Sequence, residues 1–311
     1  MLTPLSGGNT ILGHGMNLLT RLKKSVRHRA SYKLSEPLSR LLSVTGFGQY
    51  GHGPRLMSVQ PMLQTGIPVE DAPLDFEDMH RFWDELSSRS ERLRQWCQLK
   101  PVWEKMPQYY FTWRQLQPIL SREDAVFVDI ASTRDSPYFE LLRLLARTKH
   151  TFRQDLVFPA GIHGDQIGGS AAELPLDNGS VDAMTLHCSF EHFEGEADTG
   201  FIREVGRVLR PGGRVCLVPL YLGEYAFILC DPAWGYDIQP DPGTPVHLFP
   251  RWGERHGRFY SADTFRQRVY APALAAGLTA RVVHFSNILD LSPSCYTHFG
   301  LILDKPVTAS A

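Results

Sequence analysis

The sequence predicts an α/β fold in which helices cover a mostly parallel sheet. Three observations indicate this fold. Apolar strand patterns alternate with helical patterns beyond about residue 122, a Pro-Gly-Gly turn at 211–213 joins a helix to a strand, and the chain ends in two strand patterns with no helix between them. The final pair is therefore expected to be antiparallel. With 311 residues, 43% of them hydrophobic, the chain can bury a sizeable core.

Short apolar runs predict the strands of this domain, and apolar residues at helical spacing predict its helices. Ser136 before Pro137 is a typical helix start, with a capping side chain followed by proline at the first helical position. The predicted strands are 125–130, 151–157, 183–188, 214–220, 279–285 and 297–303, and the predicted helices are 137–147, 201–209 and 262–276.

A helical lead-in, residues 75–121, precedes the α/β domain. Apolar residues recur at helical intervals over 75–99, with acidic residues early and arginines later, which matches the helix dipole. A second helical pattern covers 109–120. We therefore expect the α/β domain to span residues 122–305, with a short tail at 306–311.

Residues 1–74 are predicted to be a basic, loop-rich extension. Eight Lys or Arg and one acid, Glu36, give residues 1–60 a charge of +7, and the remaining 251 residues sum to −8. Leu18, Leu22 and Val26 lie on one side of a possible amphipathic helix, with basic residues between them. Such a helix could lie on an anionic membrane surface or pack on the protein itself.

Composition excludes several classes of protein. The longest apolar stretch, 215–230, is broken by Pro219, Gly223 and Glu224 and is too polar to span a bilayer. The five cysteines form no C-x-x-C pair, so we expect neither a disulfide framework nor a metal site. Residues 61–311 carry a net negative charge, which disfavours binding to an extended nucleic acid. A cytoplasmic location, with possible peripheral contact at the inner membrane surface, is the expectation.

Two motifs between Gly169 and Leu220 carry a family resemblance. The first is GSAAELPLDNGSVD at 169–182, and the second is REVGRVLRPGG at 203–213. Both resemble motifs of the class I S-adenosylmethionine-dependent methyltransferases, of the methyltransferase type 11 kind. The stretch HGRFYS at 256–261, with the helix that follows it, resembles a third segment of the same superfamily. The resemblance covers about residues 122–305.

The resemblance implies a Rossmann-like, mostly parallel seven-stranded sheet with helices on both faces and S-adenosylmethionine as the cofactor. In this family a D-x-G-x-G-x-G loop follows the first strand. This chain has DIASTRD at 129–135, so Ala131, Thr133 and Asp135 occupy the three glycine positions. Thr133 is β-branched and disfavours the positive φ that glycine adopts.

Candidate cofactor residues follow from the positions that match the family. They lie in the loop after the first strand, at the acid after the second strand, near the expected adenine and at the end of the fourth strand. His187 is included for its position, although its alternation with apolar residues is more typical of a core histidine. The candidates are Asp129, Ala131, Ser132, Thr133, Asp155, Ser170, Ala171 and His187.

His192 and Glu191 are the candidate catalytic residues. They follow the fourth strand, beside which the resemblance places the transferable methyl group. Transfer to an oxygen acceptor requires alignment and the removal of one proton. Histidine is a natural base for that proton, and Glu191 could orient it. The alternative is that both residues only fix the loop.

Residues 221–260 lack periodicity and are predicted to be a substrate lid or loop insertion. The faces of its aromatic side chains can pack on a sugar ring, and its arginine guanidinium groups can bind an anionic group. The candidate substrate-binding residues are Tyr221, His247, Arg255, His256 and Arg258.

The sequence thus favours an enzyme that transfers a methyl group from S-adenosylmethionine, without a metal, to a hydroxyl or carboxyl of a small molecule or glycan precursor. The competing hypothesis is a methyltransferase-like binding or scaffold module that has lost its cofactor. An α/β enzyme with another nucleotide ligand is a third, weaker alternative. The oligomeric state stays open.

Overall fold

The computed structural model describes residues 33–50, 58–99, 104–132, 136–250 and 252–307. Contacts divide the chain into two compact units. Unit 1 combines residues up to 53 with 228–238 and 245–256. Unit 2 contains 54–227, 239–244 and 257–311, and it includes the predicted α/β domain.

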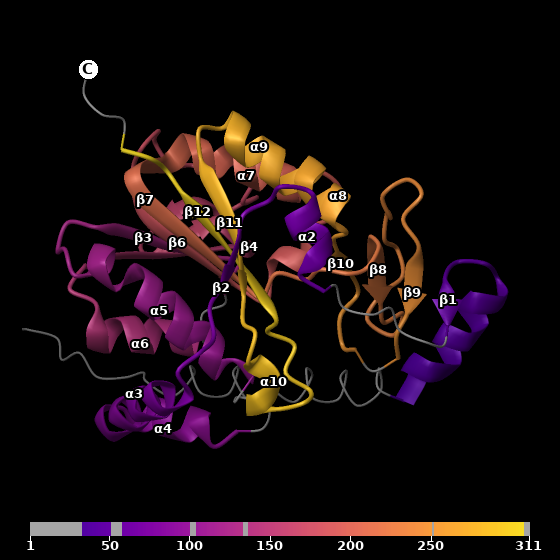
Figure 1. Ribbon diagram of the computed structural model, residues 1–311, viewed down its shortest axis with the longest axis horizontal. Helices are drawn as coiled ribbons and strands as arrows, with labels where there is room; N and C mark the ends of the chain where they lie inside the picture. The colour runs from indigo at the N-terminus through magenta and orange to yellow at the C-terminus, as the bar shows by residue number, and fades with distance from the viewer. Residues whose placement is uncertain (1–32, 51–57, 100–103, 133–135, 251, 308–311) are drawn as a thin grey trace, which may run out of the picture. The chain divides into compact units, whose positions relative to one another are not determined.

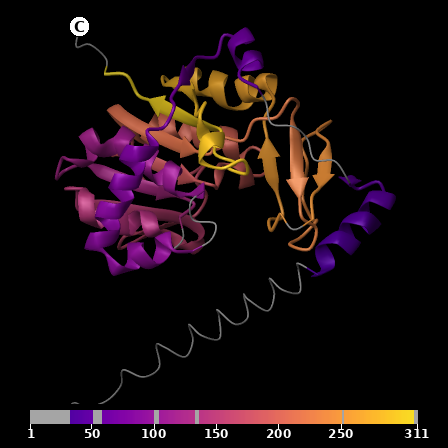
Figure 2. The same ribbon diagram turned by 60° about the horizontal axis from the view of Figure 1, so that its bottom comes forward.

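Unit 2 is built on one mixed sheet with the strand order β2-β11-β12-β7-β6-β3-β4-β5 (Figures 1 and 2). Only β12 runs antiparallel to its neighbours, β11 and β7. The predicted α/β fold with a final antiparallel pair is confirmed, and β2 adds an eighth strand. The strands are β2 (Val69–Asp71), β3 (Val126–Ile130), β4 (His150–His163), β5 (Gln166–Gly168), β6 (Val181–His187), β7 (Leu209–Val218), β11 (Thr279–His284) and β12 (Phe299–Asp304).

Helices cover both faces of this sheet (Figure 1). One apolar core lies under α2, α7 and the α8–α9 segment, and the other lies under α3 to α6. The helices are α2 (Gln60–Gln64), α3 (Phe76–Arg89), α4 (Glu91–Cys97), α5 (Met106–Leu120), α6 (Pro137–Leu145), α7 (Ala197–Val208), α8 (Ala262–Phe265), α9 (Ala271–Ala275) and α10 (Ile288–Leu291), with the shorter turns η2 (Phe190–His192) and η3 (Arg266–Tyr270).

The helix predicted over 75–99 is two helices, which meet at Ser90. Ser90 has an extended backbone, with φ −141° and ψ 116°, and its hydroxyl accepts a hydrogen bond from the amide of Leu93 at the start of α4. The same hydroxyl donates to Glu140 of α6. A serine that caps the second helix therefore ends the first.

Strand order reverses between β3 and β6. β4 follows β3 in the chain and lies on one side of it, and β6 lies on the other side. In open α/β sheets the loops at the carboxyl ends of such strands part, and ligands bind in the crevice between them. The fold therefore places the candidate site beyond Ile130 and His187.

The two motifs of the family resemblance contact one another. Glu204 of α7 accepts a hydrogen bond from the amide of Leu174 at 2.7 Å, and Arg207 donates to the carbonyl oxygens of Leu174 and Leu176. Asp182, the second residue of β6, accepts hydrogen bonds from the amide of Val126 and from two arginine side chains. These residues of the two motifs thus fix loops.

Unit 1 contains helical residues 33–44 and three short strands, β1 (Gln49–Tyr50), β8 (Phe227–Cys230) and β9 (Val246–Leu248). β9 pairs in parallel with both β1 and β8. Asp231 joins its separate segments, because its carboxylate accepts hydrogen bonds from the Ser35 hydroxyl at 2.7 Å and from the amides of Ala233 and Gly253.

The segment predicted as one loop insertion, 221–260, is therefore more ordered than expected. It contains β8, β9 and β10 (Gly257–Phe259), and it is divided between the two units. The loop-rich extension predicted at 1–74 contributes β1, α2 and β2. The candidate amphipathic helix at 18–28 lies outside the described residues.

Among the described helices, none is both long and apolar enough to cross a membrane. In the same part of the chain, His, Cys, Asp and Glu side chains form no group of three or more that could hold a metal ion.

Replacement of Asp182 by Ala is expected to lower the free energy of unfolding by about 2 kcal/mol. The reason is that the part-buried amide of Val126 loses its acceptor while Arg122 and Arg210 lose their partner. Urea unfolding measures the change. Asp177→Ala, an exposed acid of the same region, is the control and should shift stability by no more than about 0.5 kcal/mol. Equal stability of the two variants would contradict the assigned role.

Candidate cofactor site

A cavity of about 470 Å³ lies beyond the carboxyl ends of β3, β5 and β6, beside residues 154–156 of β4. Its lining comes from these residues of β4, from the loops after β3, β5 and β6, and from the segment that leads into α7. The lining residues are Ala131, Gln154, Asp155, Leu156, Ser170, Ala171, Cys188, Ser189, His192, Phe193, Glu194 and Ala197. Five of the sequence-predicted site residues thus meet in one cavity: Ala131, Asp155, Ser170, Ala171 and His192.

Ala131 keeps the backbone conformation of the glycine it replaces. Its φ is 51°, in the left-handed region that residues with a Cβ rarely adopt. Gln154 supports this turn, because its Oε1 accepts a hydrogen bond from the Ala131 amide at 3.2 Å and its Nε2 donates to the carbonyl of Gly169 at 2.6 Å. Gln154 therefore joins two sides of the cavity. Thr133 lies outside the described residues.

Asp155 and Ser170 present polar groups to the cavity. Asp155 ends the parallel part of β4, and its Oδ1 accepts a hydrogen bond from the amide of Val157 at 3.0 Å. The Ser170 hydroxyl accepts from the amide of Ala172. Leu156, which is 76% exposed, forms an apolar rim beside Asp155.

Asp129 and His187 do not line the cavity. Both are buried on the face of the sheet that carries α5 and α6, where His187 contacts the rings of Tyr109 and Tyr138 at 4.7 and 4.6 Å. Asp129 accepts a hydrogen bond from the Thr185 hydroxyl at 2.6 Å, and its Oδ1 lies 3.6 Å from His187 Nδ1. Burial lowers the pKa of His187. This pair lies behind the first cavity loop and supports it.

The candidate catalytic pair follows β6 directly. Cys188 has a left-handed backbone, with φ 50°, and the chain then turns into η2. Glu191 is buried, and its Oε1 lies 3.6 Å from His192 Nε2, while a third of the His192 side chain is exposed. His192 faces the cavity with a carboxylate behind it.

A polar cluster that the sequence did not reveal surrounds Cys188. The thiol contacts Gln108 Oε1 at 3.3 Å and the Tyr296 hydroxyl at 3.5 Å. Burial alone lowers the pKa of Lys105, but the neighbouring Cys188, Tyr109 and Glu191 outweigh it and raise that pKa. Lys105 therefore stays charged at neutral pH. It directly precedes helix α5, more than 80 residues from Cys188, so only the tertiary fold brings the two together.

Tyr221 lies beside this cluster, and its ring stacks on Tyr296 with centroids 6.2 Å apart. Burial raises the pKa of Tyr221 well above its usual value, so the hydroxyl keeps its proton. Of the other predicted substrate-binding residues, Arg258 is buried in unit 2 and contacts protein groups. His247, Arg255 and His256 belong to unit 1.

The cavity suits S-adenosylmethionine in two respects. Ala131 has the left-handed backbone that glycine commonly adopts in a turn. Asp155 lies where the parallel part of β4, the second strand of the α/β domain, ends. In addition, the buried hydroxyls of Ser132 and Ser189 have no hydrogen-bond partner among the described residues. A buried hydroxyl without a partner is uncommon, and a bound ligand would satisfy it.

Comparison with known families gives one match. Residues 143–217 match the family model of a methyltransferase domain. This confirms the predicted resemblance to a methyltransferase domain. The matched segment starts within α6, after the loop that lacks glycines, and includes both motifs at 169–182 and 203–213. The match also supports the prediction that the chain is an enzyme. No curated protein matches this chain.

Solved structures of methyltransferases show weak likenesses. The 1,6-didemethyltoxoflavin-N1-methyltransferase from Burkholderia thailandensis, solved with 1,6-didemethyltoxoflavin and S-adenosylhomocysteine, is 18% identical with a TM-score of 0.42, over 82% of this chain and 100% of that one. A putative methyltransferase of Haloferax volcanii, in complex with the Trm112 activator, is 13% identical with a TM-score of 0.40, over 68% and 96%. A protein of Methanosarcina mazei is 15% identical with a TM-score of 0.37, over 60% and 95%.

Ala131→Val is expected to lower the free energy of unfolding by about 1–3 kcal/mol, because a β-branched side chain resists the left-handed backbone. Ala131→Gly should be at least as stable as the natural chain, since glycine adopts this conformation without strain. Denaturant unfolding of the two variants makes the comparison. A valine variant as stable as the glycine variant would show that the turn is not left-handed.

Proposed function

We propose that this chain transfers a methyl group from S-adenosylmethionine to a hydroxyl or carboxyl group of a small molecule or glycan precursor. One observation carries the proposal. Within and beside the segment that matches a methyltransferase domain, the carboxyl ends of β3, β5 and β6 and residues 154–156 of β4 enclose a cavity lined by an acid, a glycine-like turn and a histidine backed by a carboxylate.

The residues of this cavity provide complementary contacts for the cofactor. Asp155 can accept hydrogen bonds from the two ribose hydroxyls, and Ser170 and Ala171 lie where the adenine is expected. Leu156 offers an apolar surface next to Asp155. The unsatisfied hydroxyl of Ser189, which lines the cavity, can bind a polar group of the methionine part.

The proposed chemistry needs a base and an aligned acceptor. The bound cofactor supplies a methyl group on a sulfonium sulfur, and the acceptor oxygen gains this group as the carbon–sulfur bond breaks. His192 takes the proton that the acceptor hydroxyl loses. Glu191, 3.6 Å from the ring, stabilises the imidazolium that results. A carboxylate acceptor needs no base.

The cluster around Cys188 supports an oxygen acceptor. Tyr221 and Tyr296 both keep their protons, because burial raises the pKa of each, and can donate hydrogen bonds. Lys105 adds a positive charge beside Cys188, which itself lines the cavity. Such groups bind a carboxylate or a hydroxyl that becomes partly negative during transfer.

The alternative is a binding or scaffold module without catalysis. Ala131 and Thr133 at glycine positions, together with Ser170 in place of an acid, favour it. The glycine-like φ of Ala131 and the 470 Å³ cavity favour cofactor binding instead. Whether S-adenosylmethionine binds decides between the two.

Calorimetric titration is expected to show binding of both S-adenosylmethionine and S-adenosylhomocysteine to the full chain. Asp155→Asn should weaken binding about tenfold, because the amide replaces one of the two acceptors for the ribose with a donor. Asp165→Asn, an exposed acid on the adjacent turn, is the control. Absence of any binding up to about 1 mM would exclude the catalytic proposal.

His192→Ala is expected to lower turnover by about 10² through loss of the base, while affinity for S-adenosylhomocysteine stays within a few-fold. Turnover is measured as S-adenosylhomocysteine released with a panel of hydroxyl and carboxyl acceptors. His80→Ala, on the exposed side of α3, serves as the control. Unchanged turnover on a hydroxyl acceptor would assign His192 a structural role.

A further inference from the structure

One wall of the cavity has no regular secondary structure. It is the segment 193–196 between η2 and α7, from which Phe193 and Glu194 line the cavity together with Ala197. Gly195 turns the chain at φ 55°. Neither a strand nor a helix holds this wall, so its position depends on other contacts.

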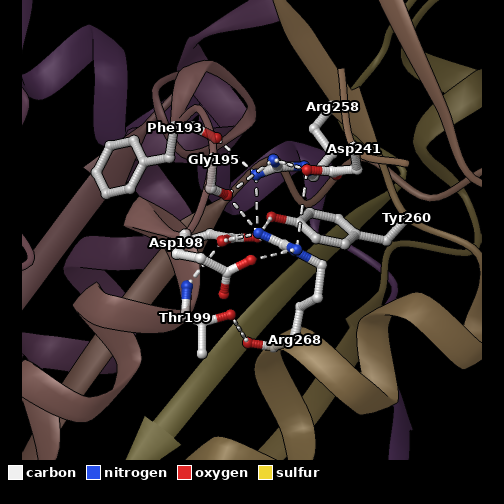
Figure 3. Close-up of polar contacts among 9 residues, drawn as sticks. Phe193, Gly195, Asp198, Thr199, Asp241, Arg258, Tyr260 and Arg268 are labelled. Atoms are coloured by element: carbon white, nitrogen blue, oxygen red, sulfur yellow. Dashed lines mark hydrogen bonds and ion pairs between the residues drawn. The ribbon is translucent and has the colours of Figure 1, made fainter. Parts of the chain in front are cut away.

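Arg258 supplies two of these contacts from β10. Its Nη1 donates to the carbonyl oxygen of Phe193 at 2.6 Å, and its Nη2 donates to the carbonyl oxygen of Gly195 at 3.1 Å (Figure 3). The other edge of the guanidinium binds both oxygens of Asp241 at 3.0 Å. A single buried side chain thus bonds to two backbone groups of the wall.

Arg268 holds the same wall from η3. Its guanidinium donates to the carbonyl of Gly195 and binds Asp198 at 2.7 and 2.9 Å. Asp198 is fully buried in the first turn of α7 and also accepts from the Tyr260 hydroxyl at 2.8 Å (Figure 3). Arg258 lies 3.0 Å from the same carboxylate.

The charges of the two arginines in this network are compensated within the protein. Two guanidinium groups face the carboxylates of Asp198 and Asp241, and the more exposed Glu196 adds a third acid next to Arg268. Neither arginine lines the cavity of 470 Å³. Any effect on a ligand in that cavity must therefore pass through the backbone of 193–198.

We infer that Arg258 and Arg268 are positioning residues, which clamp the 193–198 segment as a wall of the cofactor cavity and so set the affinity for S-adenosylmethionine without contact to it. This rests on the proposed function, because it requires the cofactor to bind in that cavity. It gives Arg258, predicted from sequence as a substrate contact, a different role. Lysine cannot replace Arg258, because one ammonium cannot bind two carbonyls and a carboxylate in the same plane.

The test compares Arg258→Lys with Arg281→Lys. Arg281 on β11 also binds two acids, Glu70 and Asp304, each at 2.7 Å, and it does not line the cavity. We expect Arg258→Lys to raise the dissociation constant for S-adenosylhomocysteine about tenfold or more. Hydrogen exchange at amides 193–198 of the ligand-free protein should accelerate in this variant alone.

The two readouts separate this inference from the proposed function. If the natural chain binds no S-adenosylhomocysteine, the proposed function fails, and so does the claim that Arg258 sets the affinity for the cofactor. The rate of hydrogen exchange at amides 193–198 still shows whether Arg258 holds this segment in place. If the natural chain binds and Arg258→Lys binds equally well, the inference is overturned.

Tyr260→Phe covers the case in which Arg258→Lys does not fold. It removes only the hydroxyl that donates to Asp198 and keeps both arginines. Weaker S-adenosylhomocysteine binding with faster exchange at 193–198 supports the clamp. Unchanged affinity and unchanged exchange in this variant would overturn it.

Discussion

Helix α7 fixes the loops that border the cavity at two of its turns. At its start, Asp198 collects two arginines and a tyrosine and thereby holds the segment before the helix. Further along, Glu204 and Arg207 bond to the backbone at Leu174 and Leu176, beyond Ser170. Charged residues of one helix therefore help to determine the position of these loops, together with Gln154 of β4, whose side-chain amide bonds to Gly169. The cavity keeps its shape because both anchors belong to the same rigid element.

The central strands add a second constraint. Asp129 of β3 and His187 of β6 lie on the same face of the sheet, next to Thr185, and they are enclosed by the rings of Tyr109 and Tyr138. Burial favours the neutral imidazole, and the carboxylate of Asp129 keeps a hydrogen-bond partner. Two polar residues are thereby accommodated in an aromatic core directly behind the turn at Ala131.

Sequence patterns predicted elements well where a local signal exists. Apolar runs located the strands of the sheet, and family motifs located Asp155, Ser170 and His192, which the structure brings into one cavity. Gln154 was missed because a glutamine in a strand does not reveal which backbone groups its amide will join. Arg258 was assigned to substrate because its partners, 17 and 60 or more residues away, depend on the fold. Local patterns predict elements, whereas side-chain partners distant in the chain require the structure.

Unit 1 combines segments that lie far apart in the chain, and this affects its folding during synthesis on the ribosome. Leu42, Phe47 and Tyr50 pack on a core formed by residues 228–248, and Ser35 bonds to Asp231, 196 positions later. At about 5–20 residues per second, the early segment waits roughly 10–40 s for its partners. During that time its apolar side chains are exposed to other nascent chains and to chaperones. In the α/β sheet, β3 to β7 are added in nearly consecutive order, whereas β2 waits about as long for its partner β11.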